Sequence, residues 1–153
     1  MEAFAQDGTK IIFEEKFSEN SFDKILLDAP CSALGQRPQY YQPMKLKELR
    51  SFAKLQKKLF ATAVQLLKNN GGVLVYSTCT FTIEENEGLV VWALQRFPQL
   101  KLVEAVPIVG QPGVLIPGLG LDQAKLVQRF AQPKAKEPFS DTIGFFIAKF
   151  VSM

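Results

Sequence analysis

The chain of 153 residues has the length of one ordinary domain, and its hydrophobic content of 47%, with 13 phenylalanines, suffices for a packed core. Histidine is absent, which excludes Ser-His-Asp and Cys-His catalysis, and two cysteines alone cannot form the usual four-ligand zinc site, so we expect no metal. The net charge of +3 permits contact with a polyanion but does not require it. Because no signal-peptide pattern and no apolar run of about 20 residues is present, we expect a cytoplasmic protein that is not bound to a membrane.

The first half of the chain alternates apolar runs with turn residues. Residues 11–13 are apolar and predict either a short strand or a packed loop. Residues 22–28 (FDKILLD) are typical of a strand buried on both faces, and the proline-containing segment 29–43 is expected to be a loop. Residues 46–68 carry apolar side chains at the three-four spacing of one helix face, and the glycine pair that follows is expected to end this helix.

The second half continues with a buried strand over residues 73–76. Thr82 is expected to be the N-cap of a helix that ends near Arg96. Three acidic residues are interpreted as helix-start residues favoured by the helix dipole, namely Glu84, Glu85 and Glu87. The remaining predicted elements are a short strand over 100–103, a short helix over 122–130 and a last strand over 143–151.

The order of these elements is strand, helix, strand, helix, strand, loop and strand, which indicates an α/β fold with right-handed crossovers. Residues 22–28 have the apolar character of a central strand, yet only about 20 residues precede them. Such a strand, flanked on one side only, would leave an apolar edge. The chain is therefore predicted to be the second half of a larger doubly wound fold.

Two of the predicted strands each end, within a few residues, in a cysteine: ILLDAPC ends at Cys31 and VLVYSTC at Cys79. Because one long helix joins these strands, we expect them to be parallel and adjacent, with Asp28 and both cysteines on one rim of the sheet. Ligands of open α/β sheets bind at this rim, and a thiol that faces a helix N-terminus is shifted toward the nucleophilic thiolate. Two alternatives stay open, namely packed core cysteines or a structural disulfide, which an intracellular setting disfavours.

The segments 28–32 (DAPCS) and 77–80 (STCT) resemble the two signature motifs of the Sun-domain RNA (cytosine-5)-methyltransferases. The helix between them, the tripeptide 85–87 (ENE) and the segment 141–146 (DTIGFF) follow in the same order, so the resemblance covers nearly the whole chain. It implies the C-terminal half of a Rossmann-like class I methyltransferase fold, with a mostly parallel sheet and a final antiparallel strand.

The resemblance also implies a chemistry. In the family, the cysteine of the second motif, here Cys79, adds to C6 of cytosine, so that C5 can attack the methyl group of S-adenosylmethionine. Asp28 resembles the residue that contacts N3 of the ring, and Cys31 resembles the second cysteine, which assists release of the enzyme. Cofactor contacts are expected from Asp7, near the adenine, and from Asp28 and Pro30, although an ordinary turn aspartate is an equal alternative for Asp7.

RNA is the partner that the resemblance implies. The segments 35–38 (GQRP) and 128–130 (QRF) look most like the branch of the family that modifies tRNA, the sixth member of the human set. Arg37 and Lys45 are candidates for phosphate contacts and Tyr40 for stacking on a base, while solvated surface or loop packing are the alternatives. The target base must be unstacked to enter such a pocket, so loops or ends of RNA are the expected substrates.

DNA cytosine methylation is the alternative chemistry. Its nucleophile follows a proline, as Cys31 follows Pro30 here. The aspartate that begins DAPCS and the second cysteine at the next strand end favour the RNA type.

The part of the family that binds the cofactor is missing from the sequence. A glycine-rich turn after the first strand normally receives the methionine end of the cofactor, and an acidic residue after the second strand holds the ribose, yet the first 20 residues contain one glycine. Residues 1–153 are therefore expected to be a partial catalytic domain without its N-terminal cofactor-binding half. The alternative function is that of a fragment or short isoform without methyl transfer, which serves as a binding or structural piece.

Overall fold

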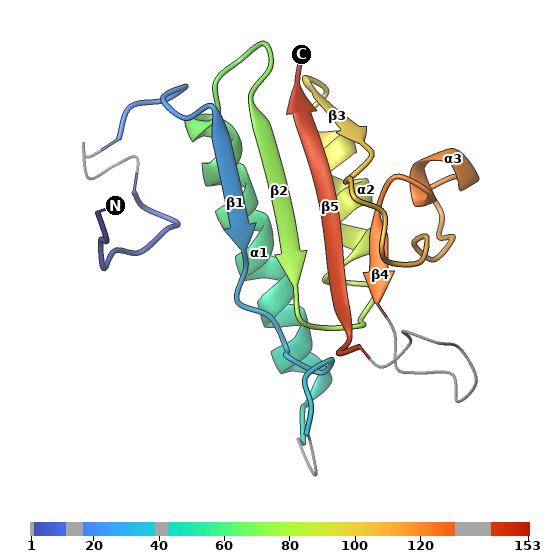
Figure 1. The fold of residues 1–153 in the computed structure, drawn as a ribbon. Coiled ribbons are helices and arrows are strands. Elements are labelled where there is room, and N and C mark those ends of the chain that lie inside the picture. Colours follow the sequence, from blue (N-terminus) through green and yellow to red (C-terminus); the bar gives the residue numbers. More distant parts are fainter. Residues whose placement is uncertain (1, 12–16, 39–42, 131–141) are drawn as a thin grey trace.

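The computed structural model describes residues 2–11, 17–38, 43–130 and 142–153. Within these residues, five strands form one sheet, and two long helices pack against it (Figure 1). The strands follow the order β1-β2-β5-β3, and β4 also pairs with β5. In chain order, the elements are β1 (Lys24–Asp28), α1 (Leu46–Leu66), β2 (Val73–Thr78), α2 (Glu87–Arg96), β3 (Leu100–Val103), α3 (Leu121–Ala124), β4 (Gln128–Phe130) and β5 (Phe145–Ser152).

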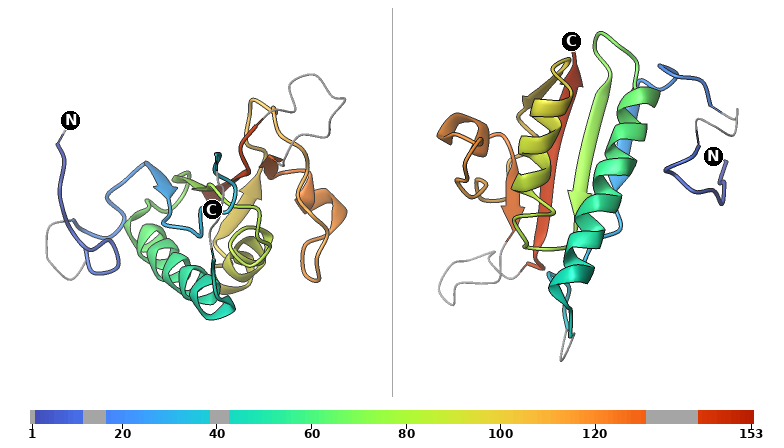
Figure 2. Two further views of the ribbon diagram at one scale, coloured as in Figure 1. Left: turned by 90° about the horizontal axis from the view of Figure 1, so that it is seen from below. Right: turned by 180° about the vertical axis from the view of Figure 1, so that it is seen from behind.

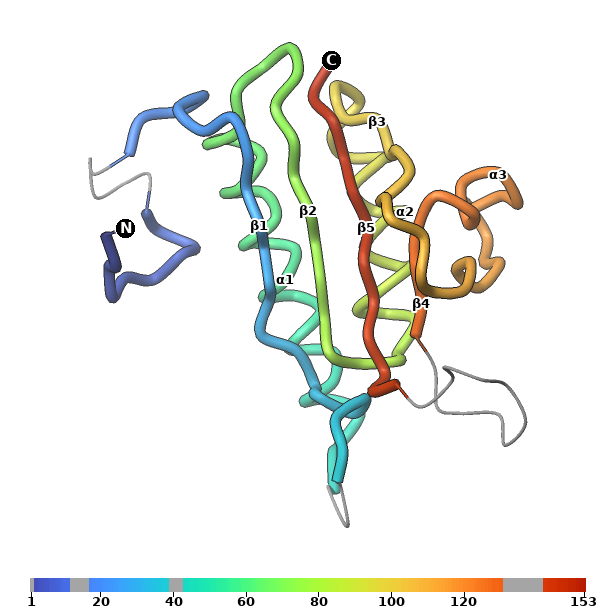
Figure 3. Tube along the Cα trace, viewed as in Figure 1, coloured from blue at the N-terminus to red at the C-terminus, as the bar shows by residue number. Residues whose placement is uncertain are grey.

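Strand β5 organises the sheet because it pairs with three other strands. It runs antiparallel to β2 on one side. On its other side, β4 pairs with residues 145–147 and β3 with residues 149–152, so these two short strands lie end to end (Figure 3). Strands β1 and β2 are parallel neighbours joined through α1. Four strands thus run one way and the last strand runs the other way, which confirms the mostly parallel sheet with a final antiparallel strand.

Both long helices cover the same face of the sheet (Figure 2). On that face Leu74, Tyr76 and Phe150 are fully buried, and the ring of Phe60 from α1 lies 5.2 Å from that of Phe150. In the described part of the chain, no helix covers the other face, where alternate residues of β2 and β5 are half-buried and Leu26 of β1 is 72% exposed. The prediction of strands buried on both faces is therefore wrong for the residues that the structure describes, because their helices cover only one face.

The helix expected directly after Thr82 begins later, at Glu87. Residues 83–86 first form a turn, in which the backbone N–H groups of Asn86 and Gly88 donate to the carbonyl of Ile83. This turn brings three consecutive side chains, 85–87, between β2 and the neighbouring segments.

The helix predicted over 122–130 is mostly wrong, since only Leu121–Ala124 is helical and Gln128–Phe130 is strand β4. Pairing with β5, which is distant in sequence, outweighs the local helix preference of this segment. Of the strand or loop predicted over 11–13, only Ile11 lies within the described residues, and it belongs to a turn. The described helices include none with the length and hydropathy to cross a membrane.

Candidate active site

The carboxyl ends of β1 and β2 form the rim on which the sequence places Asp28 and the two cysteines. The parallel register puts Asp28 opposite Ser77, and Ser77 Oγ donates to Oδ1 of Asp28 at 2.8 Å. Just beyond, the N–H of Ala29 donates to the carbonyl of Ser77 at 3.2 Å, so the DAPCS loop leaves β1 beside the end of β2. The predicted adjacency of the two strand ends is confirmed, and the exposed Asp28 is accessible to a ligand.

The two cysteines face each other across this rim. Their Sγ atoms lie 3.2 Å apart, which is hydrogen-bonding distance and longer than the roughly 2.05 Å of a disulfide, and both are free thiols. Both side chains are half-buried, and Gln36 donates from Nε2 to Sγ of Cys79 at 3.4 Å. The pair is therefore neither a structural disulfide nor two fully packed core residues.

The environment of the Cys31 thiol favours its protonated form. Burial, followed by the hydrogen bond with Cys79, raises the pKa of Cys31 from 9.0 to about 12. Cys31 is consequently a protonated thiol at neutral pH, which can donate its hydrogen to Sγ of Cys79.

We expect Cys31 to be alkylated slowly in the folded protein. In a Cys79→Ser variant, which leaves Cys31 as the one thiol, iodoacetamide should react more than about 10-fold more slowly than after denaturation at the same pH, because the thiolate is the nucleophile. With a raised pKa, the rate for the folded chain should keep rising at pH values where that of the denatured chain has levelled off. Mass spectrometry of quenched samples measures both rates, and equal rates with the same pH profile would contradict the raised pKa.

Gly35 connects the Cys79 loop, residues 79–82 after β2, to the start of β5. Its N–H donates to the carbonyl of Cys79 at 3.0 Å, and its own carbonyl accepts from the N–H of Gly144 at 2.8 Å. A Cβ at position 35 would lie 2.1 Å from the carbonyl oxygen of Gly144, so only glycine allows the two backbones to approach this closely.

Substitution Gly35→Ala should lower the free energy of unfolding by about 1–3 kcal/mol, the usual cost of forcing an extra carbon into a packed site. Gly120→Ala is the matched control, because a Cβ there meets nothing within 4 Å. Urea unfolding of both variants measures the difference. Equal midpoints for the two variants would show that the crossing at Gly35 has room to relax.

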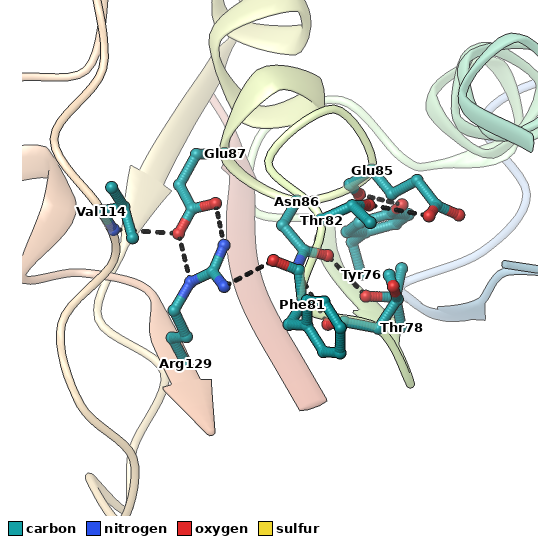
Figure 4. A network of polar contacts seen from close by, with 10 residues as sticks. Tyr76, Thr78, Phe81, Thr82, Glu85, Asn86, Glu87, Val114 and Arg129 are labelled. Carbon is teal, nitrogen blue, oxygen red and sulfur yellow. Dashed lines mark hydrogen bonds and ion pairs between the residues drawn. The ribbon is translucent and has the colours of Figure 1, made fainter. Parts of the chain in front are cut away.

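Three consecutive polar residues behind the rim, Glu85, Asn86 and Glu87, are fully buried (Figure 4). Each contacts a different neighbour: Glu85 contacts the loop after β1, Asn86 the Cys79 loop, and Glu87 the strand β4. Glu87 does begin α2, as the helix-dipole interpretation expects, but its carboxylate and that of Glu85 are buried and hydrogen-bonded to neighbouring segments. The reason is that the turn over 83–86 directs these side chains inward.

Gln56 of α1 is a second buried polar residue that the sequence interpretation missed as a site residue. Its Nε2 donates to the carbonyl of Pro30 at 3.0 Å and to Oε1 of Glu85 at 2.9 Å. The available signal was its position, because a glutamine stands among apolar residues on the buried helix face.

Glu87 forms a nearly buried ion pair with Arg129 of β4. Nε of Arg129 donates to Oε1 at 2.8 Å and its second terminal nitrogen to Oε2 at 2.5 Å, and the Arg129 side chain is 11% exposed. The N–H of Val114 adds a third bond to Oε1 at 2.9 Å, while Nη1 of Arg129 donates to the carbonyl of Phe81 at 2.8 Å (Figure 4). This arrangement joins β4 and the loop before α3 to the segment directly after Cys79.

Comparison with known proteins identifies the family of this chain. The family model described as 16S rRNA methyltransferase RsmB/F matches residues 2–151. The chain belongs to this family. Its members are Sun-domain RNA (cytosine-5)-methyltransferases, in agreement with the resemblance of the two cysteine motifs.

Two relatives of this Sun-domain family carry names that specify tRNA. The chain is 45% identical to tRNA (cytosine(72)-C(5))-methyltransferase NSUN6 of Homo sapiens, with 97% of this chain and 38% of the relative covered. It is 43% identical to tRNA (cytosine(72)-C(5))-methyltransferase of Pyrococcus horikoshii, with 83% of this chain and 28% of the relative covered. The chain thus spans well under half of the length of these relatives.

Solved structures give the same picture of a Rossmann-like methyltransferase fold. NSun6 from Pyrococcus horikoshii, crystallised with SFG, an analogue of S-adenosylmethionine, superposes with a TM-score of 0.76 at 36% identity, over 99% of this chain and 34% of that chain. A methyltransferase homologue from Pyrococcus horikoshii gives a TM-score of 0.73 at 32% identity, over 98% of this chain and 44% of that chain.

The residues expected to contact the cofactor are not all at the rim. Asp28 and Pro30 are exposed at the end of β1. Asp7 belongs to the N-terminal segment 2–11, and this segment lies beyond the β1 edge of the sheet (Figures 1 and 2). Oδ1 of Asp7 accepts from the N–H and the hydroxyl of Thr9 at 2.9 and 2.7 Å, which lowers the pKa of Asp7. Oδ2 lies 3.9 Å from the exposed Lys10.

The carboxylates of Asp28 and Asp7 fit part of S-adenosylmethionine, the methyl donor implied for the Sun-domain family. A carboxylate attracts the sulfonium charge and accepts hydrogen bonds from the adenine amine, which are roles open to Asp28 and Asp7 respectively. The sequence before β1 offers neither the glycine-rich turn after a first strand that receives the methionine end nor the second strand whose following acidic residue holds the ribose. The fit is therefore confined to the reacting end and the adenine.

The candidates for RNA contact lie along the loop that follows the cysteine motif. Arg37 is exposed directly after Gln36, and Lys45 is exposed at the N-cap of α1. Tyr40 lies outside the described residues. The two described cations therefore flank the segment that runs from the rim to the start of α1.

Proposed function

We propose that this chain carries the nucleophile-bearing part of an enzyme that methylates C5 of cytosine in RNA, with tRNA as the substrate and S-adenosylmethionine as the methyl donor. The observation that carries the proposal is the pair of free thiols 3.2 Å apart at the carboxyl ends of two parallel strands, beside the exposed Asp28. The names of the relatives, which specify cytosine C5 and tRNA, support the substrate class.

In the proposed mechanism, Cys79 acts as a thiolate. Its sulfur forms a bond to C6 of the flipped-out cytosine, and the π electron pair of the C5–C6 bond shifts toward C4 and N3, where Asp28 contacts N3 and stabilises the adduct. C5 thereby becomes the nucleophilic carbon of an enamine. S-adenosylmethionine, when bound, supplies an electrophilic methyl group for C5. Cys31 then assists release. In this step the C5 proton passes to solvent, the electron pair of the C5–H bond forms the C5–C6 double bond again, and the C6–S bond breaks with its electron pair returning to Cys79 as the thiolate.

The preceding half of the catalytic domain is proposed to supply the rest of the cofactor site. Support comes from the sheet, since one face of the described part bears no helix, β1 is an open edge, and Leu26 on that strand is 72% exposed. In α/β proteins such a sheet is covered on both faces. A segment that adds strands beyond β1 and helices on the bare face would complete this sheet and place the glycine-rich turn beside Asp28.

The RNA substrate is proposed to enter with its target base unstacked, because C6 is not accessible to a thiol inside a stacked helix. Arg37 and Lys45 are proposed to contact phosphates and Tyr40 to stack on a base near the rim. Gln36 lies between the two regions, since it contacts Cys79 directly.

The proposal is tested by methyl transfer from labelled S-adenosylmethionine to a tRNA transcript. The assay compares this chain alone with the same chain joined to the segment that precedes it in the gene, and calorimetry measures cofactor binding by both. We expect 5-methylcytosine only with the longer protein and on RNA rather than on DNA of the same sequence. Methylation of DNA would support the alternative chemistry, and a longer protein that binds the cofactor but methylates neither would support a structural role.

A further inference from the structure

Asn86 holds the Cys79 loop on both flanks of the cysteine. Thr78 Oγ1 donates to Oδ1 of Asn86 at 2.6 Å, and Nδ2 of Asn86 donates to the carbonyl of Thr80 at 3.0 Å. All three residues are fully buried. Asn86 is the N-cap residue of α2, a position where an asparagine side chain ordinarily accepts from the helix N–H groups, yet it makes no such bond. Its hydrogen-bonding capacity is used on the cysteine loop instead.

Glu85 fastens the loop that carries Cys31 to the same support. Its carboxylate accepts from the N–H and the hydroxyl of Ser32, the residue after Cys31, at 2.9 and 2.5 Å. It also accepts from Gln56 Nε2 at 2.9 Å and from Thr82 Oγ1, on the Cys79 side, at 2.7 Å. Because Glu85 is fully buried, water does not compete for these bonds.

The two loops are also tied directly to each other and to the sheet. Ser32 Oγ lies 2.8 Å from Oγ1 of Thr80, the residue after Cys79. The hydroxyl of Tyr76 on β2 donates to the backbone carbonyl of Glu85 at 2.7 Å, which links the turn over 83–86 to a central strand of the sheet. The residue that follows each cysteine is thus bonded to the same buried network.

We propose that Glu85 and Asn86 are positioning residues that set the separation of the two thiols, Asn86 by holding Cys79 and Glu85 by fastening the Cys31 loop to it. The inference rests on the proposed function for its catalytic consequence but not for its geometric content. It explains why two polar side chains are buried behind the rim, where apolar residues would pack at lower cost.

Thiol–disulfide exchange tests the geometric content without any methyl transfer. Two thiols held 3.2 Å apart should react with oxidised glutathione to give the Cys31–Cys79 disulfide, the two thiols losing their hydrogens and two electrons as glutathione is reduced. In Glu85→Gln, an amide N–H₂ group replaces one carboxylate oxygen and faces two groups that donated to that oxygen. In Asn86→Asp, the N–H₂ group that donates to the carbonyl of Thr80 is lost. Each variant should lower the equilibrium preference for the protein disulfide by about 10- to 100-fold, since a shift of about 1 Å has effects of that size on reactive geometry.

A control variant separates positioning from loss of stability. Phe150→Leu weakens the core at the far end of β5, where Phe150 packs on Phe60, and touches neither cysteine loop. We expect it to lower the melting temperature while leaving the disulfide equilibrium within about twofold of wild type, because distant sites are independent. An equal fall in all three variants, or an unchanged equilibrium in Glu85→Gln and Asn86→Asp, would overturn the positioning role.

The methylation assay then adds the functional consequence. In the longer protein, Glu85→Gln and Asn86→Asp should lower kcat with little change in KM for tRNA, because neither residue is exposed to RNA. A rise in KM at constant kcat would contradict the inference. If neither the longer wild-type protein nor its variants methylate RNA, the proposed function fails. The thiol–disulfide equilibrium with glutathione still decides whether Glu85 and Asn86 position the two cysteines.

Discussion

Cys79→Ala in the longer protein is expected to abolish both methyl transfer to tRNA and the covalent RNA adduct, whereas Cys31→Ser should retain the adduct and block its release. The two sulfurs are only 3.2 Å apart, so both can reach the same base, and their chemistry rather than their position separates the roles. Removal of a nucleophile typically costs on the order of 10⁴-fold or more in rate. Loss of Cys31 leaves Cys79 free to attack but removes the group that assists release.

A denaturing gel of labelled tRNA incubated with each variant and S-adenosylmethionine distinguishes these outcomes. The Cys31→Ser protein should give a retarded RNA band that peptide mapping assigns to Cys79. Lys101→Gln is a suitable control, since Lys101 is exposed on β3 at the end of the sheet away from the rim. An adduct that survives Cys79→Ala but disappears with Cys31→Ser would reverse the assignment and favour the DNA-type order.

Arg129→Met is expected to be the most destabilising single change considered for this chain. Among the described residues, it leaves the fully buried carboxylate of Glu87 with only the N–H of Val114, and unpairing a buried charge costs about 3–5 kcal/mol. For a chain of this length, the melting temperature should fall on the order of 10 °C. Calorimetric or circular-dichroism melting curves measure the change.

Two further variants test the reason for this loss. Lys68→Met removes the exposed ion pair with Asp23, in which the atoms are 2.8 Å apart, and should leave the melting temperature nearly unchanged because water screens that pair. The double variant Glu87→Leu, Arg129→Met should be more stable than Arg129→Met alone, since no uncompensated charge remains. A double variant that is as unstable as the sum of two losses would show that shape rather than charge governs the site.

Local sequence patterns are sufficient to predict the long helix α1 and the rim where the strands β1 and β2 end. The apolar spacing of Leu49, Phe52 and Leu59 predicts α1, and the ends of two apolar runs predict where Asp28, Cys31 and Cys79 meet. These predictions succeed because parallel strands joined by a helix bring their carboxyl ends to one edge whatever the surrounding detail. The motifs at those ends also suffice to predict the methyltransferase family.

The elements that were predicted wrongly depend on contacts between distant segments. Gln128–Phe130 has no strand pattern of its own and becomes β4 because it pairs with β5 and because Arg129 reaches Glu87. Likewise, a glutamate near a helix start fits the dipole and a buried network equally well in sequence. The turn over 83–86, which decides between them for Glu85, is visible only in the folded chain.

The sequence by itself thus determined the α/β class, the two strand-end cysteines and their family, because apolar periodicity and compact motifs are local properties of the chain. Tertiary structure alone decided the 3.2 Å separation of the thiols, the burial that raises the pKa of Cys31, and the inward direction of Glu85 and Asn86. These quantities depend on how several segments exclude water from one volume, and no single segment encodes that arrangement.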